Sequence, residues 1–375
     1  MVEIRHDLHA HPELSYEEFR TSGVIRDRLV ALGWDLAPCP TETGAVATLA
    51  GAKAGRRVML RADIDALPVT EESALSYASS TSGVMHACGH DVHTAALLGV
   101  ADLLARRRDE LAGEFTLVFQ PAEEVISGAR AMISRGLFEN HPVDAVIGAH
   151  VVSLAPLGFV GSRPGVMMSR GVTLAVAVSG RGGHAAMAVP EGNVVLAICH
   201  LVPRLDEVVA GLTFEGVNCV CSAGVVAVGT KNNVVPRHGL LRGTLRTFTD
   251  AQGDEALGRL NELLGEVAAK FDVSCELTID ESVPAVTNDE AVTAIAMASA
   301  ARVEGVSVIT FPPVTPSDDV SEFFAQAPGC YLFVGGAMAD GSSGMHHAPD
   351  FAIDDGACRV AAGVLAAGAV DLAAR

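Results

Sequence analysis

The segment MHACGHDVH, residues 85–93, constrains this chain more than any other stretch. It holds three histidines, one cysteine and one aspartate, and it runs directly into an apolar, helix-like segment from Thr94 to Leu104. Thiolate and imidazole groups favour zinc or softer ions, whereas carboxylates elsewhere in the chain would also admit manganese. A structural cysteine beside solvated histidines would give the same local sequence. The segment therefore predicts a metal site only if other parts of the chain bring further ligands to it.

Length and composition favour a soluble protein of two domains. The chain has 375 residues, of which 49% are hydrophobic and 19% are charged, and this excludes a disordered chain. Its net charge of -19 argues against a surface for nucleic-acid phosphates. The longest apolar run near the C-terminus, residues 360–370, is too short to span a bilayer, and the N-terminus has no apolar signal-like segment. We expect a cytoplasmic location, with neither nucleic acid nor a membrane as partner.

Apolar, strand-like segments repeatedly end at side chains that can bind a metal. Stretches with a helical pattern separate these segments, and this alternation predicts an α/β domain with a mostly parallel sheet and helices on both faces. The carboxyl ends of parallel strands share one edge of a sheet, where ligands bind. We therefore expect the following residues to meet Cys88 and His90 at that edge: Asp63 after strand 58–62, Glu123 and Glu124 after strand 115–119, His150 after strand 145–149, and His347 after strand 330–334.

The middle of the chain follows a different pattern. Between residues 171 and 281, strand-like segments alternate with two helical segments, 193–210 and 252–271, in the order strand, helix, strand, strand, helix, strand. This order is typical of a small α+β sandwich. We therefore predict a discontinuous metal-binding catalytic domain, residues 1–170 and 282–375, with an inserted lid domain, residues 171–281.

Eight motifs occur in one order along almost the whole chain. They are HAHPEL (9–14), LRADIDALP (60–68), MHACGHD (85–91), QPAEE (120–124), GAH (148–150), GGHAA (182–186), NVVP (233–236) and GTLRT (243–247). In these motifs the chain resembles the M20 metallopeptidase superfamily. Within it, the chain resembles the amidohydrolase branch of hippurate hydrolases, N-acyl-amino-acid hydrolases and auxin–amino-acid conjugate hydrolases.

The resemblance implies a catalytic site that holds one or two divalent ions, Mn2+ or Zn2+. Glu123 would be the general base, and Asp63 would orient or tune the site from outside the ligand set. Arg61 stands where the wider superfamily has a histidine, and its presence goes with the use of a cysteine ligand. The implied metal ligands are Cys88, His90, Glu124, His150 and His347.

The resemblance also assigns roles to the inserted domain. It implies that this domain mediates homodimerisation and that His184 reaches an active site, that of the partner subunit, to bind the reaction oxyanion. Asn233 and Arg246 would bind polar groups of the substrate, and the planar guanidinium of Arg246 suits a carboxylate. Without the resemblance, His184 would be interpreted as a loop residue, Asn233 as a turn residue and Arg246 as a surface-strand residue.

The expected reaction is hydrolysis of the amide bond of an N-acyl amino acid (acetyl, benzoyl or other acyl) to a carboxylic acid and a free amino acid. Metal-activated water would attack, and Glu123 would take its proton and pass it to the leaving amine. Taken alone, the adjacent pair Glu123 and Glu124 could equally mark a helix N-terminus. Three alternatives remain open: a dipeptidase or carboxypeptidase on the same fold, a metal-free hydrolase with Cys88 as nucleophile, and an inactive relative that only binds.

Several positions depart from the family pattern. His346 is the alternative to His347, which keeps the family spacing to the residues that follow it. Residues 188–193, AVPEGN, lack the second histidine that usually follows His184. Residues 125–127 replace a glycine-rich segment, and residues 317–320, SDDV, replace Ser-Glu-Asp-Phe. These changes lie around the expected substrate and leave its acyl group and amino acid open.

Overall fold

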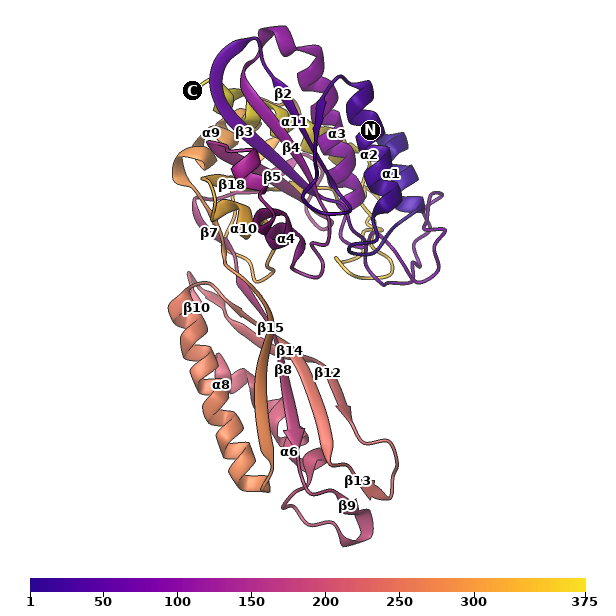
Figure 1. The fold of residues 1–375 in the computed structure, drawn as a ribbon, viewed down its shortest axis with the longest axis vertical. Coiled ribbons are helices and arrows are strands. Elements are labelled where there is room, and N and C mark those ends of the chain that lie inside the picture. The colour runs from indigo at the N-terminus through magenta and orange to yellow at the C-terminus, as the bar shows by residue number, and fades with distance from the viewer. The chain divides into compact units, whose positions relative to one another are not determined.

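The computed structural model describes all residues from Met1 to Arg375, and they form two compact units (Figure 1). Unit 1 comprises Met1–Met167, Thr287–Phe311 and Asp319–Arg375, and unit 2 comprises Met168–Val286 and Pro312–Asp318. Unit 2 contains the whole of the predicted insertion, residues 171–281, and extends a few residues beyond each end. It also takes up residues 312–318 from a later part of the chain, which no sequence pattern suggested.

An eight-stranded mixed sheet forms the centre of unit 1. In spatial order its strands are β1 (Asp35–Ala37), β2 (Ala45–Ala50), β4 (Ala112–Gln120), β3 (Lys53–Asp63), β5 (Ala145–Val152), β18 (Gly329–Gly335), β6 (Phe159–Ser162) and β17 (Ser307–Thr310). The pairs β4/β3, β3/β5, β5/β18 and β6/β17 are parallel. The pairs β1/β2, β2/β4 and β18/β6 are antiparallel. The centre of the sheet is therefore parallel, and the antiparallel pairs flank it.

Helices cover both faces of this sheet. One face carries α2 (Phe19–Ala31), α3 (His90–Arg106), α9 (Glu290–Ala300) and α11 (Gly356–Ala373), and the other carries α4 (Gly128–Ser134), α5 (Leu137–Asn140) and α10 (Val320–Phe324). Successive side chains of a strand point to opposite faces. Val58, Leu60 and Ala62 of β3 are accordingly buried against the first set of helices, and Met59 against the second. Burial on both faces explains why this strand is a continuous apolar run in the sequence.

Three element boundaries differ from the sequence-based prediction. Strand β5 continues to Val152, so His150 lies within the strand and not after it. The helical stretch expected between strands 115–119 and 145–149 is split at Gly136, whose φ of 94° is left-handed. The helix predicted over 193–210 is interrupted at Pro203, because proline has no N–H to continue the helical hydrogen bonds.

Helix α11 is long and apolar enough to pass a test for a membrane-spanning helix. It has 18 residues and so extends beyond the apolar run 360–370 at both ends. However, 67% of it is buried inside the structure, where it packs on α3 and α9. The core helix of a folded domain passes the same test, and the burial identifies α11 as a core helix of unit 1.

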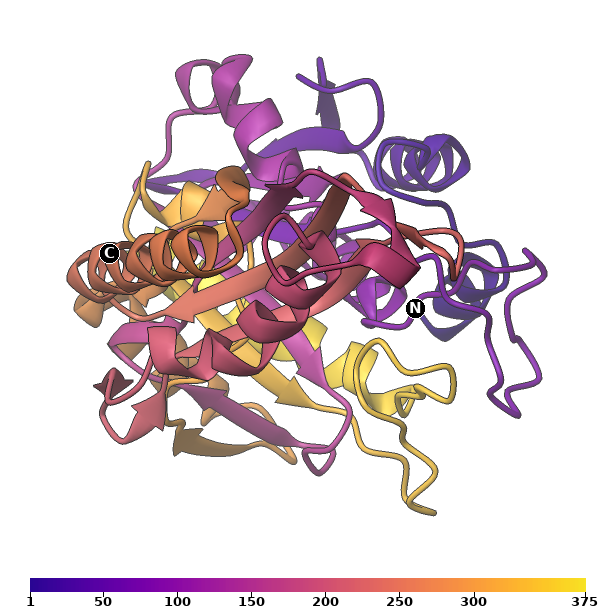
Figure 2. The ribbon, with the colours of Figure 1, turned by 90° about the horizontal axis from the view of Figure 1, so that it is seen from below.

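Unit 2 is a two-layer α+β sandwich. Its antiparallel sheet has the spatial order β12 (Val220–Val228), β14 (His238–Thr247), β8 (Arg170–Ser179) and β15 (Ser274–Val283). Helices α6 (Val194–Leu201), α7 (Leu205–Val208) and α8 (Asp250–Phe271) pack on it, and Figure 2 shows α8, in orange, running along the strands. The order of strands and helices along the chain is the predicted one. Short pairs complete the strand inventory: β7 (Gly165–Met168) with β16 (Val286–Asn288), β9 (Gly183–His184) with β13 (Val234–Val235), and β10 (Thr213–Phe214) with β11 (Val217–Asn218).

Helix α1 (Val2–Ala10) is attached to the start of α3 through buried charges. Arg5 Nε donates to Asp91 Oδ2 (3.1 Å), and His9 Nδ1 lies 3.0 Å from the same oxygen. His9 Nε2 also faces Glu71 Oε1 at 3.3 Å. Burial alone would lower the pKa of His9, but Asp91 and Glu71 outweigh this effect and raise the pKa to about 9. His9 is therefore a buried cation at neutral pH, and it neutralises the carboxylate that directly follows His90.

This ion pair predicts a pH-dependent contribution to stability. Because the pKa of His9 in the folded protein, about 9, exceeds the ordinary 6.5, the contribution is fully present below pH 6.5 and is lost as the pH rises through 9. We expect His9→Asn to lower the free energy of unfolding by about 3 kcal/mol at pH 6, measured by urea denaturation, and by much less at pH 9.5. The exposed His11, changed to Asn, is the control and should leave the stability nearly unchanged. A deficit of equal size at both pH values would contradict the assignment.

Candidate metal centre

Strand β3 ends in a buried carboxylate at the edge of the sheet. The carboxylate of Asp63 accepts hydrogen bonds from Arg61 Nη1 (2.7 Å) and His93 Nδ1 (2.6 Å). Burial alone would raise the pKa of Asp63, but the interactions with His90, Arg61 and His93 lower it well below its usual value. Asp63 is therefore a permanent negative charge inside the protein.

Asp65, two residues later, joins three segments of the chain. Its Oδ2 accepts hydrogen bonds from Ser15 Oγ (2.7 Å) and from the backbone N–H of Glu124 (3.0 Å). His90 Nδ1 lies 2.9 Å from the backbone oxygen of Asp65 and 3.3 Å from Oδ1. A single buried side chain thus holds His90 and Glu124 next to each other.

The other nitrogen of His90 faces a carboxylate oxygen without bonding to it. Because the backbone oxygen of Asp65 can only accept, His90 Nδ1 is the donor and Nε2 is the atom available to a ligand. Nε2 lies 3.7 Å from Glu124 Oε1, and both atoms are buried without a hydrogen-bond partner. Two ligands about 2.1 Å from one ion lie about 3.4 Å apart at a tetrahedral angle. The spacing and the missing partners therefore suit two ligands of one metal ion.

Cys88 and His150 lie on another side of the same cluster. Cys88 Sγ is 3.5 Å from His150 Nε2, and His150 Nδ1 donates to the backbone oxygen of Val151 (2.7 Å), so Nε2 carries the lone pair. Burial lowers the pKa of His150 well below its ordinary value and keeps the ring in the neutral form that binds metals. Burial, with the nearby charge of Glu124, raises the pKa of Cys88 well above its ordinary value.

The adjacent residues His346 and His347 have different surroundings. His347 Nε2 lies 3.7 Å from Glu124 Oε2. His346 Nδ1 instead faces Cys88 Sγ at 3.7 Å, and its Nε2 accepts the backbone N–H of Ser153 at 3.3 Å. Since both ring nitrogens of His346 are engaged, the geometry favours His347 as the metal ligand.

The ligand-type atoms form one connected cluster. Three of the five groups whose ligand-type atoms lie within 4.8 Å of one another are made up of the predicted ligands and Glu123: Cys88 with His90 and His150, Cys88 with Glu124 and His347, and His90 with Glu123 and Glu124. The shared members bring all five predicted ligands and Glu123 together. Thiolate, imidazole and carboxylate donors in one cluster are suited to a divalent transition metal. Together with the unpaired His90 Nε2 and Glu124 Oε1, this donor set fits a metal centre.

The two glutamates lie on the loop between β4 and α4. They do not begin a helix, so a favourable interaction with a helix dipole does not explain them. Burial raises the pKa of Glu124 to about 7, and Glu123 Oε2 lies 3.9 Å from His90 Nε2. Ala122 and Ile126 in the same loop have left-handed φ values of 55° and 54°. Such strain persists only where the surroundings impose it, and it is concentrated at functional sites.

The sequence analysis assigned no role to His93, which the structure places against the cluster. The backbone N–H of Val151 donates to His93 Nε2 (2.9 Å), and His93 Nδ1 donates to Asp63. With both nitrogens in use, His93 supports neighbouring groups and does not act as a ligand. Its position three residues after His90 on α3 could have indicated this location, because residues three apart share one face of a helix.

Arg61 supplies a buried cation behind the cluster. Its side chain is 1% exposed and binds Asp63, Gln120 Oε1 (2.8 Å) and Asp319 Oδ1 (2.9 Å). The side chain thereby links the sheet edge to the residue that precedes α10. At this position of the chain a structural cation, and not an imidazole, stabilises Asp63.

The three predicted substrate-binding residues belong to unit 2. His184 and Asn233 lie together at one end of the unit, where β9 pairs with β13 (Figure 1). Arg246 lies near the other end of the sheet, on β14, where Nη1 donates to Ser317 Oγ. The stretch of β14 from His238 to Arg246 separates the two ends by about 25 Å, since a strand rises about 3.3 Å per residue. Within one chain, His184 and Arg246 therefore do not contact the same small molecule.

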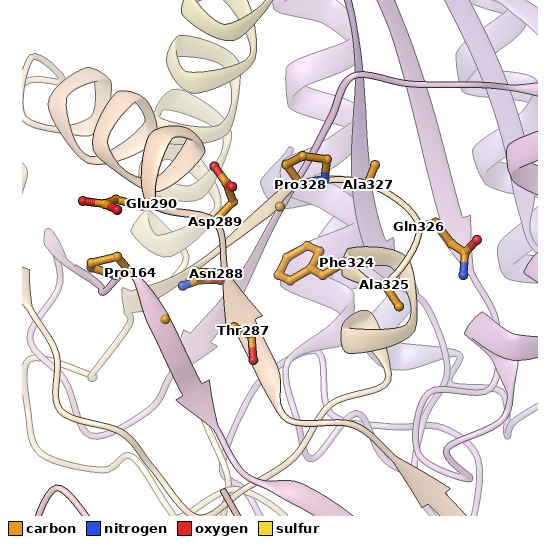
Figure 3. Close-up of a pocket in the computed structure, with 12 residues that line it drawn as sticks. Pro164, Thr287, Asn288, Asp289, Glu290, Phe324, Ala325, Gln326, Ala327 and Pro328 are labelled. Atoms are coloured by element: carbon orange, nitrogen blue, oxygen red, sulfur yellow. The ribbon is translucent and has the colours of Figure 1, made fainter. Parts of the chain in front are cut away.

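A separate hollow of about 920 Å³ lies elsewhere in unit 1 (Figure 3). Its wall includes Asn288, Asp289, Glu290 and Phe324. Asp289 caps α9 by accepting the N–H of Val292 (2.9 Å), and neither cysteine nor histidine lines the hollow. The hollow therefore lacks the donor set of the cluster around His90.

Comparison with known proteins agrees with the motifs. The model of peptidase family M20/M25/M40 matches residues 59–370. N-acetyl-L-cysteine deacetylase of Bacillus subtilis (strain 168) is 36% identical over 355 residues, which cover 95% of this chain and 84% of that protein. Thermostable carboxypeptidase 1 of Saccharolobus solfataricus is 33% identical over 371 residues, which cover 96% of this chain and 92% of that protein.

The fold is shared as well. The crystal structure of a dinuclear metal-binding peptidase of the M20 family from Bacillus subtilis has a TM-score of 0.82 and 30% identity, and the match covers 98% of this chain and 96% of that one. The family match and the coverage of these relatives extend over most of the sequence, including the motifs from LRADIDALP onward. The chain belongs to peptidase family M20/M25/M40 and is a hydrolase that acts on amide bonds.

Proposed function

We propose that this protein is a metal-dependent amidohydrolase that cleaves N-acyl amino acids, with one or two divalent ions, Mn2+ or Zn2+, in each subunit. The observation that carries the proposal is the pair of buried, unpartnered atoms His90 Nε2 and Glu124 Oε1, 3.7 Å apart within a cluster of cysteine and histidine. The relative named N-acetyl-L-cysteine deacetylase supports the substrate class, and the dinuclear peptidase supports the metal.

The residues of the cluster have three different roles: binding the metal, transferring the proton and orienting a ligand. Cys88, His90, Glu124, His150 and His347 would hold a divalent ion, and when bound it would supply a lowered pKa of water and polarisation of the substrate carbonyl. Glu123, which is 8% exposed and adjacent to a ligand, takes the proton of the attacking water and delivers it to the leaving amine. Asp65 keeps His90 in the orientation and tautomer that present Nε2.

A metal-free cysteine hydrolase fits this site poorly. The nucleophile of such an enzyme is a thiolate with a lowered pKa beside a cationic group. Here burial and Glu124 raise the pKa of Cys88 and outweigh the lowering effect of the neighbouring His90, so this pKa lies well above its ordinary value. Burial keeps another neighbouring imidazole, that of His150, neutral. A carboxypeptidase remains the second candidate, because a relative with that name is 33% identical over most of its length.

We propose that the active form is a homodimer in which unit 2 mediates the contact. The separation of His184 from Arg246 supports a site that takes His184 from one subunit and Arg246 from the other. Strand β12 is an edge of the sheet in unit 2, and its Val225 and Val226 are 50% and 48% exposed. An apolar edge strand of this kind pairs readily with the same strand of a second copy.

A cytoplasmic location is part of the proposal. All eight cysteines are free, and Cys88 is needed as a thiolate ligand, which suits a reducing compartment. The net charge of -19 supports partners other than nucleic acid.

The substrate class is tested by release of free amino acid from N-acetyl, N-benzoyl and longer N-acyl amino acids, beside dipeptides and carboxypeptidase substrates. The protein is treated with a chelator and assayed before and after Mn2+ or Zn2+ is added. We expect release from the N-acyl amino acids only after metal is restored. Faster release from peptides would favour the carboxypeptidase, and full activity in chelated protein would contradict a metal enzyme.

The general base is tested by Glu123→Gln, which keeps the shape of the side chain and removes its basicity. We expect turnover to fall about 100- to 10,000-fold, with the metal content of the purified protein unchanged. Cys88→Ala and His150→Ala should lose metal as well as activity, and the exposed Glu17, changed to Gln, should behave as wild type. Near-normal turnover in Glu123→Gln would show that another group is the base.

The shared site is tested by mixing two inactive variants, Glu123→Gln and His184→Ala. A mixed dimer has one site with an intact Glu123 that receives an intact His184 from the Glu123→Gln subunit. After subunit exchange at equal amounts, we expect about a quarter of wild-type turnover, because half of the dimers are mixed and each has one working site. Each variant exchanged with itself is the control. No recovery in exchanged mixtures would contradict donation of His184 between subunits.

A further inference from the structure

Besides the imidazoles of the proposed ligands, the sulfur of Cys88 faces one further imidazole, that of His346, which the proposed function does not use. His150 Nε2, at 3.5 Å, belongs to the proposed ligand set. His346 Nδ1 lies 3.7 Å from the same sulfur, within hydrogen-bonding range of a sulfur acceptor. The function proposed above gives no task to His346.

The ring of His346 is held so that Nδ1 carries its proton. The backbone N–H of Ser153 donates to Nε2 at 3.3 Å and so occupies the lone pair of that nitrogen. In a neutral imidazole the proton then resides on Nδ1, which faces Cys88. The ring packs between His150 and Phe351, with centroid distances of 5.4 Å and 5.0 Å, and these contacts limit its rotation.

We propose that His346 is a positioning residue that donates an Nδ1–H···S hydrogen bond to the Cys88 thiolate and thereby tunes this sulfur as a metal ligand. The inference rests on the proposed role of Cys88 as a ligand. A buried thiolate close to Glu124 has little water to stabilise its charge, and a fixed donor fills that need while it orients the sulfur.

The chain turns sharply between this donor and the next residue. His347 has a left-handed φ of 67°, and its Nε2 faces Glu124 Oε2 at 3.7 Å while His346 faces the sulfur. The two adjacent histidines thus face two different ligands of the site. His346 donates to the thiolate, and His347 is itself one of the proposed ligands.

Cobalt-substituted protein reports on this bond directly. A thiolate bound to Co2+ gives a charge-transfer band, and a hydrogen bond to the sulfur lowers the energy of the lone pair from which the electron comes. We expect His346→Leu to move the band to longer wavelength and to raise the Co2+ dissociation constant about 10- to 100-fold, with an unchanged number of bound ions. His346→Asn keeps an N–H near the position of Nδ1 and should stay close to wild type. The exposed His11, changed to Leu, is the matched control.

Three results would overturn the proposal. An unchanged band and dissociation constant in His346→Leu would show that the bond has no effect on the sulfur. Loss of a bound Co2+ from that variant would make His346 a ligand itself, a result expected instead for His347→Leu. A wild-type protein without the thiolate band would remove Cys88 from the ligand set and this inference with it.

Two further measurements keep these outcomes distinct. Amide hydrolysis is measured separately by amino-acid release, so normal hydrolysis with a wild-type band in His346→Leu would overturn only the role of His346. The melting temperature of the metal-free variants checks folding. If His346→Leu does not fold, His346→Ala is compared with His346→Asn by the same band and dissociation constant, with the same expected and contradicting results.

Discussion

Two buried carboxylates at the end of β3 impose the arrangement of the site. A buried carboxylate needs hydrogen-bond donors or a positive charge in place of water. Burying a carboxylate without such partners costs several kcal/mol of folding free energy. Asp63 accepts hydrogen bonds from Arg61 and His93. Asp65 lies within hydrogen-bonding distance of His90 and accepts hydrogen bonds from donors in two loops. These partners come from different segments of the chain, so the same contacts that satisfy two charges also assemble the cluster of metal-binding side chains.

The loops around the cluster adopt a backbone that they would not adopt alone. Four of the six non-glycine residues with left-handed φ lie in segments next to it: Tyr16, Ala122, Ile126 and His347. Each such conformation costs on the order of 1 kcal/mol or more and persists because the surrounding contacts over-determine it. The backbone that carries the proposed base and the proposed fifth ligand is therefore shaped by packing, which favours a preorganised site over one that forms on binding.

The general location of the site could be predicted because it depends on a local rule. Apolar strands that end in acidic or histidine residues, separated by helices, bring those residues to one sheet edge, and Cys88 and His90 stand at a helix start beside it. The role of His93 was missed, although its spacing from His90 was visible. The inclusion of residues 312–318 in unit 2 had no local signal at all, because it depends on contacts between residues 146 and 71 positions apart, Ser169 with Thr315 and Arg246 with Ser317.

The sequence by itself determined the types of donor, their order along the chain, the family and the two-unit organisation, since these depend on composition, periodicity and motif. Only the tertiary structure decided which nitrogen of each histidine is available. Backbone groups of Asp65, Val151 and Ser153 set the tautomers of His90, His150 and His346. These groups carry no side-chain signature, and most of them reach the ring across a long sequence separation. For that reason the sequence could not separate His346 from His347 by geometry, whereas the folded chain gives them different partners.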